Sequence, residues 1–156
     1  MKLYLKQKVF SFFDNFTAKD ESGNDIYFVE GRLAFGKQLE VFNSNGQSVA
    51  YITQKLMSFL PRFDIELKGK HTCTVIREFS FLGQNYTIEG IGWDLRGDFL
   101  AHEYQLYENE KVIMDMTRAL FSWGDSYEIS IEKEENALLC LCIALAVDAC
   151  IAVRKK

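Results

Sequence analysis

The chain has 156 residues, 48% of them hydrophobic, which is enough to build one domain with its own core. Charged residues make up 26% and the formal net charge is -4, which excludes a global attraction to nucleic acid or to an anionic membrane, so any anion site must be local. The first ten residues, MKLYLKQKVF, contain three lysines and lack the unbroken apolar core of a secretory signal. We therefore expect a cytoplasmic protein with no nucleic-acid partner.

The N-terminal strand is expected to be basic on one face. Because side chains in a strand point alternately to its two faces, this face carries Lys2, Tyr4, Lys6 and Lys8. If the fold brings the C-terminal Arg154 nearby, the binding residues Lys2, Lys6, Lys8 and Arg154 form a local patch for anionic lipid or phosphate headgroups. The alternative is that the lysines keep an exposed strand soluble and prevent edge pairing.

From residue 3 to about residue 131 the chain alternates short strands with turn residues. Residues 62–68 (RFDIELK) alternate apolar and charged side chains, which is typical of a half-buried strand, and residues 127–131 repeat the pattern. Turn signals fall at residues 21–25, 43–46, 68–70, 83–85, 96–98 and 108–110. Their regular spacing predicts an all-β sandwich or barrel.

A weak internal repeat supports this prediction. Four hairpin-like units each contain a basic residue, an aromatic residue three to five positions later and then a turn residue: GRLAFG (Arg32), QKLMSFLP (Lys55), REFSFLG (Arg77) and TRALFSWG (Arg118). Such repetition indicates a β-meander wound round one core. Chance matches are the alternative, because thirteen phenylalanines are spread over the chain.

The C-terminal segment is different, because residues 137–153 (ALLCLCIALAVDACIAV) are apolar apart from Asp148. Acidic residues precede it and basic residues follow it, the charge order that a helix dipole favours. A helix at about 133–153 that is apolar all round must be buried in protein or in lipid. Its length of roughly 25 Å is below the roughly 30 Å hydrocarbon core of a bilayer, and Asp148 adds a cost there. We predict a helix buried inside the barrel and no transmembrane span, with membrane insertion as the alternative.

Few side chains indicate chemistry. The four cysteines are expected to be reduced and buried, and the two histidines have no spacing suited to zinc. Asp148 must reach solvent or a polar partner or have a raised pKa, and we expect a structural hydrogen bond. Trp93, Asp94 and Trp123 lie beside glycines and could frame a pocket, although core packing explains them more simply. With no nucleophile or phosphate-binding motif, we expect no catalytic residue, no metal and no cofactor.

Five segments, taken in their order and spacing, carry a resemblance to a known family. They are FTAKDESGNDIYFVEGRL (16–33), SVAYITQKLMSFLPRFDI (48–65), YTIEGIGWDLRGDFLAHEY (86–104), FSWGDSYEI (121–129) and the terminal apolar helix. Over nearly its whole length the chain resembles the LURP-one-related family of the tubby C-terminal-like superfamily, which includes phospholipid scramblases. The resemblance implies a mainly β fold, a closed antiparallel barrel of about twelve strands that encloses a hydrophobic C-terminal α-helix, as one domain over residues 1–156.

The resemblance implies less about function. Tubby-like relatives bind phosphoinositide headgroups through a basic surface, and scramblase relatives carry an acidic calcium segment before the last helix. Here residues 126–136 (SYEISIEKEEN) do not form a recognisable calcium loop. We expect a non-enzymatic binding or scaffold domain, with anionic phospholipid headgroups or a protein as candidate partners and a peripheral place at the membrane. The alternative is a membrane-associated, scramblase-like protein whose C-terminal helix is inserted in lipid.

Overall fold

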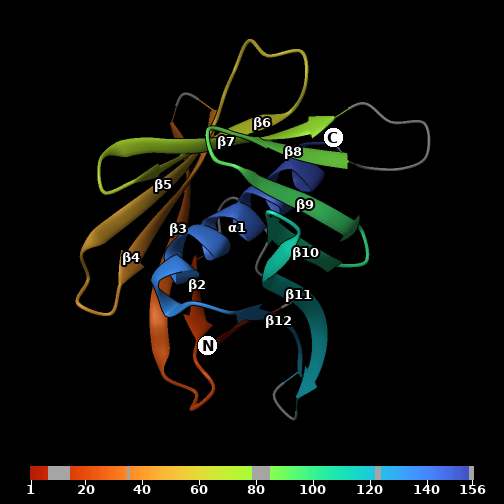
Figure 1. Ribbon diagram of the computed structural model, residues 1–156. Helices are drawn as coiled ribbons and strands as arrows, with labels where there is room; N and C mark the ends of the chain where they lie inside the picture. Colours follow the sequence, from red (N-terminus) through yellow and green to blue (C-terminus); the bar gives the residue numbers. More distant parts are fainter. Residues whose placement is uncertain (7–14, 35, 79–84, 122–123, 155–156) are drawn as a thin grey trace.

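The computed structural model describes residues 1–6, 15–34, 36–78, 85–121 and 124–154. Within them the chain forms twelve strands followed by two helical segments (Figure 1). The strands are β1 (Lys2–Lys6), β2 (Asn15–Lys19), β3 (Asp25–Ala34), β4 (Gly36–Asn43), β5 (Ser48–Gln54), β6 (Arg62–Leu67), β7 (Lys70–Glu78), β8 (Asn85–Glu89), β9 (Trp93–Asp98), β10 (Glu103–Glu108), β11 (Lys111–Phe121) and β12 (Gly124–Ile131). The helical segments are the 3-10 helix η2 (Glu134–Asn136) and the α-helix α1 (Ala137–Arg154).

The twelve strands form one antiparallel sheet in the order β8-β7-β6-β5-β4-β3-β2-β1-β12-β11-β10-β9. The first and last strands of the chain lie side by side, with Lys2 opposite Ser130 and Lys6 opposite Ser126. The two edge strands, β8 and β9, are consecutive in the chain, so the sheet curls into a nearly closed barrel with its seam between them. The predicted antiparallel barrel of about twelve strands is confirmed.

The helix α1 runs through the middle of the barrel (Figure 1). Every residue from 140 to 151 is buried, so the barrel covers the helix on all its faces. Strand side chains that alternate toward the inside, such as Leu3, Phe63 and Ile65, are wholly buried in the same apolar cluster. Each contributes about 2 kcal/mol by leaving water. The predicted core helix is confirmed, with η2 in place of its first turn.

By length and composition alone, the segment Glu134–Val153 would qualify to cross a membrane, since its mean hydropathy is 2.3. In this fold 72% of the segment is buried inside the protein. The inner wall of the barrel supplies the apolar surroundings that such a helix requires. This arrangement is compatible with a soluble protein.

Most of the predicted turns are confirmed, at residues 21–25, 43–46, 68–70 and 108–110. Of the turn predicted at 83–85, residues 83–84 lie outside the described residues and Asn85 begins β8. The turn predicted at 96–98 is wrong, because these residues belong to β9. Gly97 serves close backbone approach instead, since a Cβ there would lie 2.6 Å from the carbonyl oxygen of Glu103 on the neighbouring strand.

The barrel has two unlike ends. Connections after even-numbered strands lie at the end where β12 finishes and α1 begins, which we call the start end. Connections after odd-numbered strands lie where α1 finishes, which we call the tip end; there the thiol of Cys150 lies 3.9 Å from the carbonyl oxygen of Pro61. The four units of the sequence repeat all close in tip-end connections, so their basic residues share one end of the barrel: Arg32, Lys55, Arg77 and Arg118.

Candidate functional site

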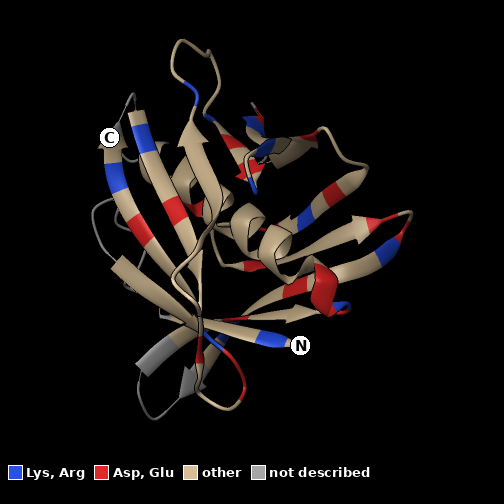
Figure 2. Ribbon diagram, turned by 90° about the vertical axis from the view of Figure 1, so that its left-hand side faces the viewer, with Lys and Arg blue, Asp and Glu red and all other residues tan. Residues whose placement is uncertain are grey.

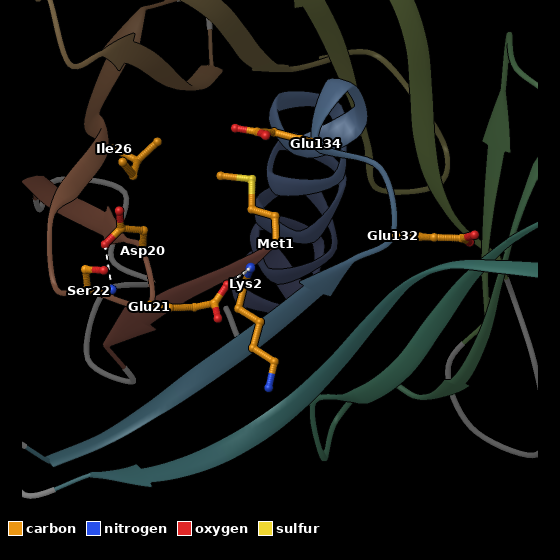
Figure 3. Close-up of a pocket in the computed structure, with 8 residues that line it drawn as sticks. All are labelled: Met1, Lys2, Asp20, Glu21, Ser22, Ile26, Glu132 and Glu134. Atoms are coloured by element: carbon orange, nitrogen blue, oxygen red, sulfur yellow. Dashed lines mark hydrogen bonds between the residues drawn. The ribbon is translucent and has the colours of Figure 1, made fainter.

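The start end of the barrel holds an acidic pocket of about 650 Å³ (Figure 3). Its lining residues are Met1, Lys2, Asp20, Glu21, Ser22, Ile26, Glu132 and Glu134. Four carboxylates therefore outnumber the two ammonium groups, and the Lys2 side chain points away from those of Ile26 and Glu134. The net negative charge repels an anion, so this pocket does not suit a phosphate group.

Lys2 is the member of the predicted anion patch whose side chain the structure describes. It lies on the outer face of β1, because its neighbour Leu3 is wholly buried. Its Nζ lies 2.8 Å from Oε1 of Glu128 on β12, and the hydrogen bond to this carboxylate raises the pKa of Lys2. The partner carboxylate offsets much of the positive charge that an anionic ligand would need.

The other members of the patch are placed only by their backbone. Lys6 ends β1 and Arg154 ends α1, but their side chains, and Lys8 as a whole, lie outside the described residues. Lys2 lies near the start end of the barrel and Arg154 at the tip end, so the two residues are separated by the length of α1 (Figure 1). The fold therefore does not bring Lys2 and Arg154 together, and binding by Lys6, Lys8 or Arg154 stays a prediction.

The tip end carries a projecting segment, residues 55–61, between β5 and β6 (Figure 1). Its base is fixed by hydrogen bonds from the backbone N–H of Lys55 to the carbonyl of Arg62, at 3.0 Å, and from that of Arg77 to the carbonyl of Pro61, at 2.9 Å. Its outer part exposes apolar side chains, with Met57 at 104% and Phe59 at 98% of their reference accessibility. We call residues 55–61 the projecting segment.

Basic residues surround the base of the projecting segment, and Figure 2 shows them in blue at both of its ends. Lys55 is exposed, and Arg62 and Arg77 are half-buried. The Nε atoms of both arginines are buried and have no hydrogen-bond acceptor in the part of the chain that the structure describes. Because these Nε atoms are buried, an external anion would meet the other N–H donors of the two half-buried guanidinium groups.

These side chains differ from the ones that the sequence indicated. Lys55, Phe59 and Arg77 were predicted only as members of the repeat, and Met57 was not singled out. A usable signal was present, because residues 56–60 (LMSFL) do not alternate as a half-buried strand would, and they lie between a lysine and a proline. The full exposure of Met57 and Phe59 follows from the length of the connection, which carries them beyond the sheet.

A buried polar cluster lies where the tip end meets α1. Nε2 of His102, in the β9–β10 turn, lies 2.7 Å from Oδ1 of Asp148, and the His102 ring stacks on Tyr127 at 4.2 Å between centroids. Burial raises the pKa of Asp148, against the opposing hydrogen bond to His102. The hydrogen bond predicted for Asp148 is therefore present, and its structural role stays a prediction.

Among the described residues no group of three or more His, Cys, Asp or Glu side chains is placed to hold a metal ion. All four cysteines are free and buried, as predicted. Trp93 is buried and donates from its Nε1 to Glu108 at 3.0 Å, in agreement with the predicted packing role, whereas Trp123 lies outside the described residues.

The chain is similar to known proteins over most of its length. A model of the LURP-one-related family matches residues 1–148. The uncharacterized protein YxjI of Bacillus subtilis (strain 168) is 39% identical over 149 residues, which cover 95% of this chain and 92% of that protein. The X-ray structure of a protein from Arabidopsis thaliana aligns with a TM-score of 0.60 and 16% identity, over 92% of this chain and 88% of the plant chain. The plant structure shows likeness of fold alone.

Proposed function

The chain belongs to the LURP-one-related family, and the name of its Bacillus subtilis relative states no activity. We therefore propose a function from the geometry of the barrel. We propose that the protein is a non-enzymatic binding domain that recognises anionic lipid headgroups at its tip end. The observation that carries the proposal is a set of basic side chains around the projecting segment that have no carboxylate partner among the described residues: Lys55, Arg62 and Arg77.

The contrast with other basic residues supports this assignment. Elsewhere on the barrel several cationic side chains lie within ion-pair distance of carboxylates, as Lys2, Lys19, Arg32, Arg96 and Lys111 do. Among the described residues Lys68 and Lys70, at the start end, form no such pair, so they serve below as the comparison. Within the described residues no such pair involves Lys55, Arg62 or Arg77. Lys55, Arg62 and Arg77 gather around one segment, so they attract an anion locally even though the net charge of the chain is -4.

Arginine chemistry fits a phosphate-bearing ligand. The guanidinium group presents its N–H donors in a fixed planar fork that matches the oxygens of a phosphate. Arg77 also lies near Cys150, on the last turns of α1, where the helix dipole favours positive charge. The negative end of the helix and the unpaired arginines therefore form the setting of the proposed headgroup site.

The burial of α1 supports peripheral binding over the scramblase-like alternative. To enter a bilayer, α1 would have to leave the barrel and expose the inward side chains of all twelve strands. That exposure would cost tens of kcal/mol at about 25 cal/mol for each Å² of apolar surface. A cytoplasmic protein that binds only at the membrane surface avoids this cost, because its core stays intact.

Vesicle co-sedimentation tests the proposal. Wild-type protein is mixed with phosphatidylcholine vesicles, with and without phosphatidylserine, at low and physiological salt. The charge variant K55Q/R62Q is compared with K68Q/K70Q, which removes two exposed lysines at the opposite, start-end terminus of β6. We expect binding to anionic vesicles only, weakened by salt, and lowered about fivefold for each charge removed at the tip end.

The outcomes separate two sources of the anion. Titration of inorganic phosphate, followed by NMR shifts of the arginine Nε–H groups, reports a free anion; pelleting with vesicles but no response to phosphate reports a membrane surface. The proposal fails if wild-type protein does not pellet with anionic vesicles, or if the two charge variants lose binding equally.

A further inference from the structure

The structure carries a second feature at the tip end, apolar rather than charged. We infer that the projecting segment inserts Met57 and Phe59 below the headgroups of an anionic bilayer, while Lys55 and Arg62 remain at the headgroup level. This inference rests on the proposed function and specifies its partner as a lipid bilayer instead of a free anion. The protein would then bind the membrane both through charge and through the apolar side chains of Met57 and Phe59.

The exposure of the projecting segment is the first support. Large apolar side chains that are fully exposed are costly for a protein in water and mark contact surfaces when they gather. Met57 and Phe59 are both fully exposed, and Leu56 beside them is half exposed. Leu56 is also the anchor of the segment, because its Cγ packs 3.2 Å from the position that a Cβ on Gly36 would occupy.

The distribution of exposed apolar residues over the barrel is the second support. Among the described residues, seven large apolar side chains are exposed: Phe28, Leu33, Leu56, Met57, Phe59, Leu100 and Val112. Five of them belong to tip-end connections or the strand residues beside them, namely Leu33, Leu56, Met57, Phe59 and Leu100. Three of these five lie within the projecting segment, so the apolar surface peaks where the chain projects furthest (Figure 1).

The order of basic and apolar residues along the projecting segment fits a membrane interface. Residues 55–63 (KLMSFLPRF) contain no acidic residue, and their basic residues occupy positions 55 and 62 at the base, with apolar residues between them. Basic side chains interact with anionic headgroups, and apolar side chains of a surface-bound protein reach roughly 5–10 Å into the headgroup and acyl boundary. Phenylalanine at the outermost part of the segment suits that depth.

A bilayer fits better than a second copy of the same segment. Two projecting segments that met tip to tip would bring their lysines and arginines together and repel each other. A head-to-tail contact, with the tip end of one molecule on the acidic pocket of another, is the competing arrangement, and it changes the mass in solution. An anionic bilayer satisfies the charges and the apolar side chains at once.

The test uses a fluorescent reporter at the proposed insertion point. In F59W the new indole is exposed in the free protein, and we expect its emission to shift to the blue and to be quenched by brominated acyl chains when anionic vesicles are added. Wild-type protein supplies the background signal of the two native tryptophans, Trp93, which is buried, and Trp123. The same change in V112W, an exposed apolar position at the start end, should show neither response.

Partition measurements complete the test. M57N/F59S should bind anionic vesicles at least about tenfold more weakly than wild type, since burial of a Phe or Met side chain is each worth about that factor, and V112S should bind normally. Asn is chosen at position 57 because the backbone φ there is 63°, which Asn tolerates. Circular dichroism and thermal unfolding confirm that both variants remain folded.

The results distinguish this inference from the proposed function. If M57N/F59S binds as wild type and F59W is not quenched while K55Q/R62Q loses binding, headgroup recognition stands and insertion is overturned. If K55Q/R62Q binds as wild type while M57N/F59S does not, insertion stands and headgroup recognition is overturned. A concentration-dependent dimer in sedimentation velocity that M57N/F59S abolishes, with no vesicle binding, overturns both in favour of a second copy.

Discussion

Nε2 of His102 lies 2.7 Å from Oδ1 of Asp148, and this contact joins the β9–β10 turn to the central helix. The strand β9 has only one neighbour in the sheet, because the seam of the barrel lies on its other side. A polar contact from the adjacent turn to α1 therefore helps to hold the edge of the sheet on the core. The second carboxylate oxygen of Asp148 and the hydroxyl of Tyr104 are buried nearby, without a hydrogen-bond partner among the described residues.

Loss of the imidazole should destabilise the fold more than loss of the carboxylate. His102→Ala leaves the carboxyl of Asp148 buried and unpartnered, and we expect a loss of about 3 kcal/mol. Asp148→Leu removes the buried polar group at similar volume, and His102, whose side chain is 16% exposed, can turn to water, so about 1 kcal/mol is expected. Urea unfolding measures both, and the reverse order would contradict the assigned roles. Vesicle binding by the folded Asp148→Leu protein should match wild type.

Asp148 should also make the stability depend on pH in a definite direction. Burial raises the pKa of this carboxyl above its ordinary value of 3.8, so the folded protein holds the proton more tightly than the unfolded chain does. Its contribution to stability is complete below about pH 4 and is lost as the pH rises through the raised pKa. Urea unfolding of wild type and Asp148→Asn at several pH values should show the advantage of wild type shrinking as the pH rises. A difference that is constant or grows with pH would refute this linkage.

The four thiols should be unreactive in the folded protein. Burial raises the pKa of Cys73, Cys140 and Cys150 to about 12, and raises that of Cys142 as well. Because the thiolate is the reactive form, the native protein should react with an aromatic disulfide reagent only slowly at mildly alkaline pH. After unfolding in guanidinium, all four thiols should react with the reagent. Prompt reaction of even one native thiol would show that a cysteine is accessible.

Gly97 should tolerate no side chain. A Cβ at this position would lie 2.6 Å from the carbonyl oxygen of Glu103 and from Cα of Tyr104, and the backbone φ of 137° is itself unfavourable for alanine. We expect Gly97→Ala to lower the free energy of unfolding by about 3 kcal/mol or more. Gly46→Ala is the matched control, since φ is 77° there but the space is open, and about 1 kcal/mol is expected. Thermal unfolding of the two variants checks the difference, and equal losses would mean that close approach is not the reason for Gly97.

The misjudged turn at 96–98 shows where local patterns fail. The residues Arg96, Gly97 and Asp98 read locally as turn residues, yet they form the end of β9. The requirement for glycine comes from a neighbouring strand, whose backbone approaches at positions 103 and 104. A local pattern contains no information about that approach, because it depends on how two separate strands pair.

The candidate site was only partly predictable for the same reason. The lysine at position 2 is exposed and basic, as the alternation in the first strand predicted, but its neighbour on β12 is Glu128. The pairing of the first strand with the last decides this, and the pattern of either strand alone does not. Likewise, the apolar run at 56–60 is compatible with a core strand until the lengths of β5 and β6 place it outside the sheet.

By itself the sequence determined the class of fold. The alternation of apolar and polar residues and the segment at 137–153, apolar apart from Asp148, are local properties that dictate which side chains must leave water. They predicted an all-β sandwich or barrel and a buried helix, and the resemblance to the LURP-one-related family implied the closed barrel around that helix. Only the tertiary structure decided which groups meet: His102 with Asp148, 46 residues apart, and an acidic pocket at the start end opposite a tip end where Lys55, Arg62 and Arg77 lie beside the exposed Met57 and Phe59. These contacts depend on strand register and on the lengths of the connections, which set the distances between residues that are remote in the chain.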